Sequence, residues 1–120
     1  MTYVDTNVLV RLITGDDIVL RNQAVHMIES SAKNSIVVHA TVLAELGFVL
    51  EFHEYKMQRK DICSAMRSVF DLSSVKIDNN LLKIIAIYEA NPKLDFTDAL
   101  LLAESNGSLM TFDKDLQKLL

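Results

Sequence analysis

Four acidic side chains stand where carboxylates can do chemistry. Asp5 directly follows an apolar stretch that predicts a short buried strand, and Asp113 comes shortly after another one. Glu45 and Asp98 lie in stretches with helical spacing, and most of their neighbours three and four residues away are apolar. A buried carboxylate is costly unless it is compensated, so these two acids need a cation, hydrogen bonds or a metal ion.

Together the four carboxylates predict a divalent-metal site. Carboxylate oxygens are hard ligands, and their typical cations are Mg²⁺ and Mn²⁺. Such an ion orients a water molecule, lowers its pKa and stabilises the departing oxygen of a phosphodiester. Because clustered acids repel one another without the ion, some of them should have raised pKa values. The predicted catalytic and metal-binding residues are Asp5, Glu45, Asp98 and Asp113.

Each acid also has a structural interpretation when it is taken alone. Asp5 and Asp113 stand where helix N-caps are expected, and Glu45 could form an ordinary ion pair with a lysine or arginine. Asp95 precedes Asp98 by three residues, so the two carboxylates can share one helix face. An acid in the first turn of a helix is also favoured by the helix dipole. Possible additional members of the site are Asp95 and Asp115.

The elements that must position these acids alternate between short strands and helices. Strands are predicted at residues 2–4, 36–38, 75–77 and 109–111, from short apolar or β-branched runs. Helices are predicted at residues 8–13, from Asp17 to the break at Asn34, and at 41–50, 61–70, 79–90, 97–105 and 113–119. This alternation predicts an α/β fold whose parallel sheet is covered on both faces.

Composition bounds the class of protein. The chain has 120 residues, half of them apolar, which predicts a single globular domain over residues 1–120. The net charge of −4 gives no basic signature of nucleic-acid binding, although a bound cation would offset part of it. The only cysteine, Cys63, is expected in the core, and the absence of a disulfide fits a reducing cytoplasm. No apolar run predicts a membrane span, and Asp5 interrupts the start too early for a signal peptide.

Other patterns point to different chemistry. His53-Glu54 resembles the start of a zinc motif, but Met57 stands where a second histidine would be needed. A haloacid-dehalogenase-type phosphatase also starts with an aspartate after a strand, but it needs a second aspartate where this chain has Asn7. A basic cluster, Lys56, Arg59 and Lys60, fits either a solvated helix start or contacts with RNA phosphates.

The acids lie in four motifs that resemble those of the PIN-domain family. Residues 3–11 (Tyr-Val-Asp-Thr-Asn-Val-Leu-Val-Arg) look like the opening motif, and residues 41–45 (Thr-Val-Leu-Ala-Glu) resemble the second. Residues 95–103 (Asp-Phe-Thr-Asp-Ala-Leu-Leu-Leu-Ala) resemble the third, and residues 109–115 (Leu-Met-Thr-Phe-Asp-Lys-Asp) the fourth. Each motif is short, but they occur in the family's order and span nearly the whole chain.

The resemblance implies a three-layer α/β/α PIN-like fold with a central parallel sheet of four to five short strands. It also implies a divalent-metal nuclease site, in which Asp5, Glu45, Asp98 and Asp113 match the family's acidic positions. Asp115 matches a position where some members supply a further acid, so either Asp113 or Asp115 can be the fourth acid. Thr6 and Thr111 match small hydroxyl positions that often support the site.

The chain's brevity is most similar to the VapC-like toxins of toxin–antitoxin pairs. That resemblance implies an endoribonuclease with an RNA substrate and a cognate antitoxin protein. The helices from Asp17 to Leu50 carry more apolar residues than are needed to cover one small sheet. This excess predicts a homodimer and a further interface for the antitoxin. The alternative left open is a PIN-like scaffold that binds a partner without catalysis.

Overall fold

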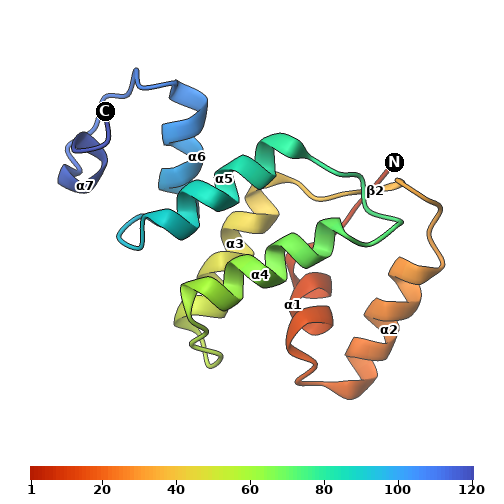
Figure 1. The fold of residues 1–120 in the computed structure, drawn as a ribbon. Helices are drawn as coiled ribbons and strands as arrows, with labels where there is room; N and C mark the ends of the chain where they lie inside the picture. The colour runs from red at the N-terminus through yellow and green to blue at the C-terminus, as the bar shows by residue number, and fades with distance from the viewer.

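The structure is a computed structural model that describes all 120 residues (Figure 1). The chain forms seven helices and one very small parallel sheet. In chain order the elements are β1 (Thr2–Tyr3), α1 (Thr6–Thr14), α2 (Ile18–Glu29), β2 (Ile36–Val37), α3 (Ala40–Phe52), α4 (Arg59–Phe70), α5 (Asn79–Ala90), α6 (Phe96–Ser105) and α7 (Lys114–Gln117).

The sheet is smaller than the sequence predicts. β1 pairs in parallel with β2, with Thr2 opposite Ile36 and Tyr3 opposite Val37. The predicted strand at residues 75–77 is reduced to a single parallel bridge between Val75 and Ile36, because helix α5 follows almost at once. The predicted strand at residues 109–111 pairs with nothing. A sheet of four to five strands is therefore not confirmed.

The core lies between helices α1, α3, α4 and α5. Helix α3 contributes Leu43, Leu46 and Leu50, which recur at three- and four-residue spacing and are fully buried. Gly47 lies on the same helix, where an added Cβ would stand 3.1 Å from the Tyr88 hydroxyl and 3.3 Å from the Met66 Cε. Glycine therefore permits the close approach of α3 to α4 and α5. The predicted burial of Cys63 is confirmed.

Local signals set most helix ends. Asp78 caps α5 by accepting a hydrogen bond from the Leu81 N–H. Asn106 adopts the left-handed conformation that ends α6. Helix α3 is predicted from residue 41 but begins at Ala40, and His39 caps it, since His39 Nδ1 accepts from the Thr41 N–H.

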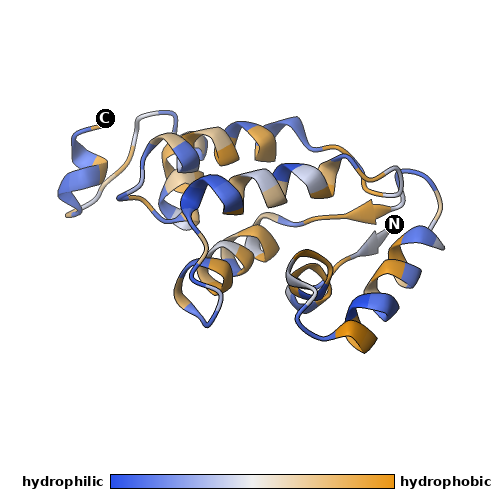
Figure 2. Ribbon diagram, turned by 60° about the horizontal axis from the view of Figure 1, so that its bottom comes forward, coloured by the Kyte–Doolittle hydropathy of each residue, from blue (hydrophilic) through white to orange (hydrophobic).

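Helix α2 leaves much of its apolar surface uncovered. Only Ala24 and Ile28 are buried, whereas Ile18, Val19 and Met27 are exposed. Figure 2 shows this as hydrophobic colour on the outlying first turn of the helix. None of the helices is both long and apolar enough to span a membrane.

Candidate active site

Thr6 links Asp5 and Glu45, because it forms a hydrogen bond with each of their carboxylates. Asp5 follows β1 and is the N-cap of α1. Its Oδ1 accepts a hydrogen bond of 2.8 Å from the Thr6 N–H. The Thr6 hydroxyl is buried at the start of α1 and donates a 3.0 Å hydrogen bond to Oε2 of Glu45 on α3. This tertiary contact holds two of the predicted acids beside the N-terminus of α1.

Glu45 is exposed, so its predicted position on a buried face is wrong. The prediction relied on apolar neighbours, but one of them, Phe48, is itself exposed. Helix α3 is apolar nearly all round, and this weakens the distinction between its two faces in the sequence. The exposed carboxylate is open to solvent and to a ligand approaching from outside.

Asp95 and Asp98 form a second acidic pair, which caps helix α6. The Asp98 N–H donates to Oδ1 of Asp95 at 2.8 Å, and the Asp95 N–H donates to Oδ2 of Asp98 at 3.3 Å. This reciprocal arrangement is a capping box with aspartate in place of the usual glutamate. Asp95 is therefore the N-cap of α6, and Asp98 has a structural role whatever else it does.

Among the predicted acids, Asp98 has a raised pKa. Burial raises the pKa of its carboxyl, and the negative charges of Asp95 and Asp113 raise it further. The hydrogen bond from the Asp95 backbone opposes this shift. A raised pKa is what clustered acids are expected to show when no cation is bound, and it identifies Asp98 as a group that positive charge would stabilise.

Arg59 positions the loop that leads into α6. Its guanidinium donates to the carbonyls of Tyr88 at 2.7 Å and Leu94 at 2.9 Å, and lies 3.8 Å from the centre of the Tyr88 ring. A further hydrogen bond of 3.2 Å reaches the Pro92 carbonyl. Asp95 follows directly, so Arg59 fixes where the second acidic pair begins.

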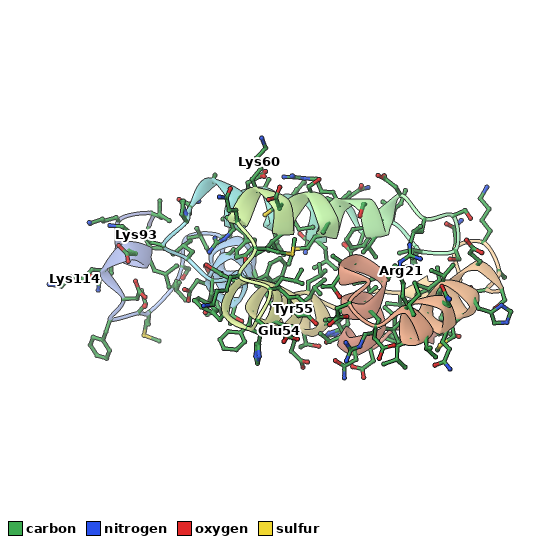
Figure 3. The ribbon with its side chains drawn as sticks, turned by 90° about the horizontal axis from the view of Figure 1, so that it is seen from below. Arg21, Glu54, Tyr55, Lys60, Lys93 and Lys114 are labelled. Atoms are coloured by element: carbon green, nitrogen blue, oxygen red, sulfur yellow. The ribbon has the colours of Figure 1, made fainter.

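Sequence reasoning missed this role, because it interpreted Arg59 as part of a surface cluster with Lys56 and Lys60. Lys60 does point away from the body of the molecule, as Figure 3 shows. The side chain of Arg59 is only 14% exposed and turns inward. The one available signal was the unpaired carbonyls expected at the end of α5, near Asn91-Pro92, which an arginine can cap.

Asp113 caps α7, the last and shortest helix. Its Oδ1 accepts hydrogen bonds from the N–H groups of Asp115 and Leu116, at 2.8 Å and 3.1 Å. The hydroxyl of Thr111 accepts from the Asp113 N–H at 3.0 Å. Asp113 is exposed and Asp115 is half-buried. The two predicted candidates for the fourth acid thus belong to the same small helix cap.

Within one chain the predicted acids form pairs rather than a cluster. No three Asp, Glu, His or Cys side chains lie close enough together to hold a metal ion. The donor type suits Mg²⁺ or Mn²⁺, but the positions of the acids in a single chain do not. The assignment of Asp5, Glu45, Asp98 and Asp113 to one metal site therefore stays a prediction.

Comparison with protein families gives one match. The family model of the PIN domain matches residues 2–119, which is nearly the whole chain. Neither the comparison with curated proteins nor the comparison with solved structures found a significant match.

Proposed function

This chain belongs to the PIN-domain family, and we propose that it is a metal-dependent endoribonuclease that hydrolyses RNA phosphodiester bonds. PIN domains are α/β proteins, are generally nucleases and generally use divalent metal ions. The observation that carries the proposal is the family match over residues 2–119, which includes all four acidic motifs. The finer role, toxin of a toxin–antitoxin pair, is part of the proposal and rests on the resemblance to VapC-like toxins.

The proposed ligands of Mg²⁺ or Mn²⁺ are Asp5 and Asp98, with Glu45 and Asp113 binding directly or through water. The hydrogen bond from Thr6 to Glu45 supports the first half of this set, because it holds an exposed carboxylate next to Asp5. The raised pKa of Asp98 supports the second half, because burial, and then the negative charges of Asp95 and Asp113, disfavour its ionised form without a cation. Asp95, Asp115, Thr6 and Thr111 complete the proposed surroundings.

The proposed partners are RNA, a second copy of the chain and an antitoxin protein. Exposed apolar side chains on two helices support protein contacts, namely Ile18, Val19 and Met27 on α2 and Phe48 and Phe52 on α3. Light scattering should show a dimer, and a monomer at all working concentrations would contradict this. Expression of the chain should arrest growth, and co-expression of a small protein from the neighbouring reading frame should relieve the arrest.

A nuclease assay with a matched control tests the catalytic proposal. Wild-type protein should cleave RNA with Mg²⁺ or Mn²⁺ and lose this activity with EDTA. Asp98→Asn should reduce cleavage at least about 100-fold, since even outer-shell changes cost about 10- to 100-fold in metal sites. Asp71→Asn makes the same change in charge at an exposed position after α4 and should cleave normally. Normal cleavage by Asp98→Asn, or cleavage that resists EDTA, would refute the assignment.

One observation favours a second candidate, a PIN-like scaffold that binds a partner without catalysis. No three acids gather in one chain, as an active metal site would need. The same assay separates the two functions, because a scaffold should show no metal-dependent cleavage for wild type or either variant. The phosphatase alternative gains no support from the family match.

A further inference from the structure

Residues 109–112, which we call the arch, connect α6 to α7 without regular secondary structure and leave two large apolar side chains uncovered. Met110 is 99% exposed and Phe112 is fully exposed. The backbone N–H groups of residues 109–112 make no hydrogen bond to another backbone group. Exposure alternates along the segment, since Leu109 and Thr111 are partly covered. A bare apolar segment with period-two alternation is typical of a strand that lacks its partner.

Strand β1 has the complementary deficiency, an unpaired edge. The N–H groups of Thr2 and Val4 donate to the β2 side, to Ser35 and Val37. Alternate residues of a parallel strand point to opposite edges, so the N–H and C=O of Tyr3 face away from β2. No other strand lies on that edge, because the sheet contains only β1 and β2. The Tyr3 side chain is 65% exposed. This edge can accept one more parallel strand.

The arch does not reach the β1 edge of its own chain while α7 stays in place. Leu116 on α7 is buried, and α7 shares a groove with the α5–α6 loop, lined by residues including Asn91, Leu94 and Leu119. Figure 1 shows this end of the molecule opposite the end that carries β1, and the longest extent of the molecule is 44 Å. An arch and an edge at opposite ends fit two copies lying antiparallel, each of which serves the other.

We propose that the arch of one copy pairs in parallel with β1 of a second copy, in a closed two-fold dimer. A register with Thr111 opposite Tyr3 places Asp113 beside Asp5 of the other copy, because both acids then follow their strands by two residues at the same edge. Asp5 and Glu45 of one chain and Asp113 of the other would then form one composite acidic site. The functional meaning of that site rests on the proposed nuclease activity, whereas the pairing does not.

The pairing accounts for two observations with one arrangement. It covers the unpaired edge and the exposed arch, each of which is costly alone. It also gathers a third carboxylate at the Asp5–Glu45 pair, where a single chain supplies none. Two-fold symmetry makes the exchange reciprocal, so both copies gain a strand and both sites are completed.

Disulfide trapping between two separately made chains tests the pairing. Tyr3→Cys chains mixed with Thr111→Cys chains should form a covalent dimer on mild oxidation, because the proposed register places these residues side by side. Tyr3→Cys mixed with Met110→Cys is the matched control. Met110 is the more exposed residue but faces the opposite side of the arch, so this mixture should react at least about ten-fold more slowly. Cys63 stays out of the reaction, since burial raises its pKa to about 11.

Two results would overturn the pairing. Equal trapping of Met110→Cys and Thr111→Cys would show random collision rather than a register. A Tyr3→Cys/Thr111→Cys double variant that closes an internal disulfide as a monomer, with no trapping between the single variants, would show that the arch folds back onto its own chain.

Complementation then tests the composite site. Asp5→Asn and Asp113→Asn chains should each be inactive alone. After mixing and subunit exchange, about one quarter of wild-type cleavage should return, since half the dimers are mixed and each mixed dimer holds one complete site. Active wild type with no recovery in the mixture would refute the composite site but leave the nuclease proposal intact. Register-specific trapping with inactive wild type would refute the nuclease and leave the pairing intact.

Discussion

Glu45 reaches Thr6 and the Asp5 cap through a hydrogen bond that spans 39 residues of sequence, whereas Asp95 and Asp98 meet within one turn of the same helix. The first pair depends on the packing of α1 against α3, and it comes apart if either helix moves. The second pair depends only on a helix start, which forms wherever α6 forms. Two acidic pairs in one molecule thus differ in whether the chain's fold or its local sequence holds them.

The largest expected effect comes from Arg59, which places the second pair without touching it. Arg59→Lys should destabilise the protein by about 2 kcal/mol, because an ammonium group cannot replace a guanidinium that binds several carbonyls and stacks on Tyr88. Urea unfolding measures this change. Amide hydrogen exchange at Asp98 should accelerate more than exchange at Thr6, because only Asp98 adjoins the loop that Arg59 binds.

Arg67→Lys is the control for Arg59, because it makes the same substitution on the same helix. Arg67 pairs with Glu89 near the surface, so the loss should be under about 0.5 kcal/mol. Similar losses for the two variants would mean that Arg59 does not anchor the loop. Equal acceleration of exchange at Thr6 and Asp98 in Arg59→Lys would mean that the two pairs are not independent.

Thr6→Val breaks the first pair while it keeps the shape of the side chain. The free energy of unfolding should fall by about 1.5 kcal/mol. This is the lower end of the usual contribution of a hydrogen bond to a charged group, and the lower end applies because Glu45 is exposed. Thr6→Ser retains the hydroxyl and should lose less. In a Glu45→Ala background, Thr6→Val should cost about 1 kcal/mol less than it does in wild type, and additive losses would show that the hydrogen bond contributes nothing.

Two substitutions at Asp95 separate its effect as a helix cap from the effect of its negative charge on Asp98. Asp95→Ala removes both and should cost about 1 kcal/mol, whereas Asp95→Asn keeps a capping oxygen and should cost much less. Both substitutions remove a negative charge, so the pKa of Asp98 should fall in both. Urea unfolding and NMR titration of the Asp98 carboxyl measure the two effects. An unchanged pKa would mean that burial alone raises it.

The smallest expected effect is the pH dependence that Asp98 contributes. Its pKa is raised above 3.8, so the folded state holds this proton more tightly than the unfolded state does. The ionised carboxylate therefore costs stability above the folded pKa, and this cost disappears as the pH falls towards about 3.8. Asp98→Asn should be more stable than wild type at neutral pH, and the difference should shrink on acidification. Thermal melts across this range measure it, and a difference that grows at low pH would contradict the raised pKa.

The family match agrees with the order of the four motifs in the sequence. The positions of the acids in space, by contrast, could be predicted only in part. The caps at Asp78 and Asp95 and the left-handed end at Asn106 are predictable, because each depends on residues within one helical turn. The burial of Leu46 and Leu50 agrees with the apolar spacing of α3, whereas the burial of Leu43 could not be told from sequence, because nearly the whole helix is apolar.

Other features were decided only by tertiary structure. The exposure of Glu45 depends on which sides of an almost wholly apolar helix meet other helices. The inward turn of Arg59 depends on carbonyls that lie about thirty residues away in sequence. The run at residues 109–111 has the composition of a strand, yet a strand needs a neighbour for its hydrogen bonds, and no segment of the same chain is placed to supply one. Local sequence determines how a segment can fold, and the partners that reach it in space determine whether it does.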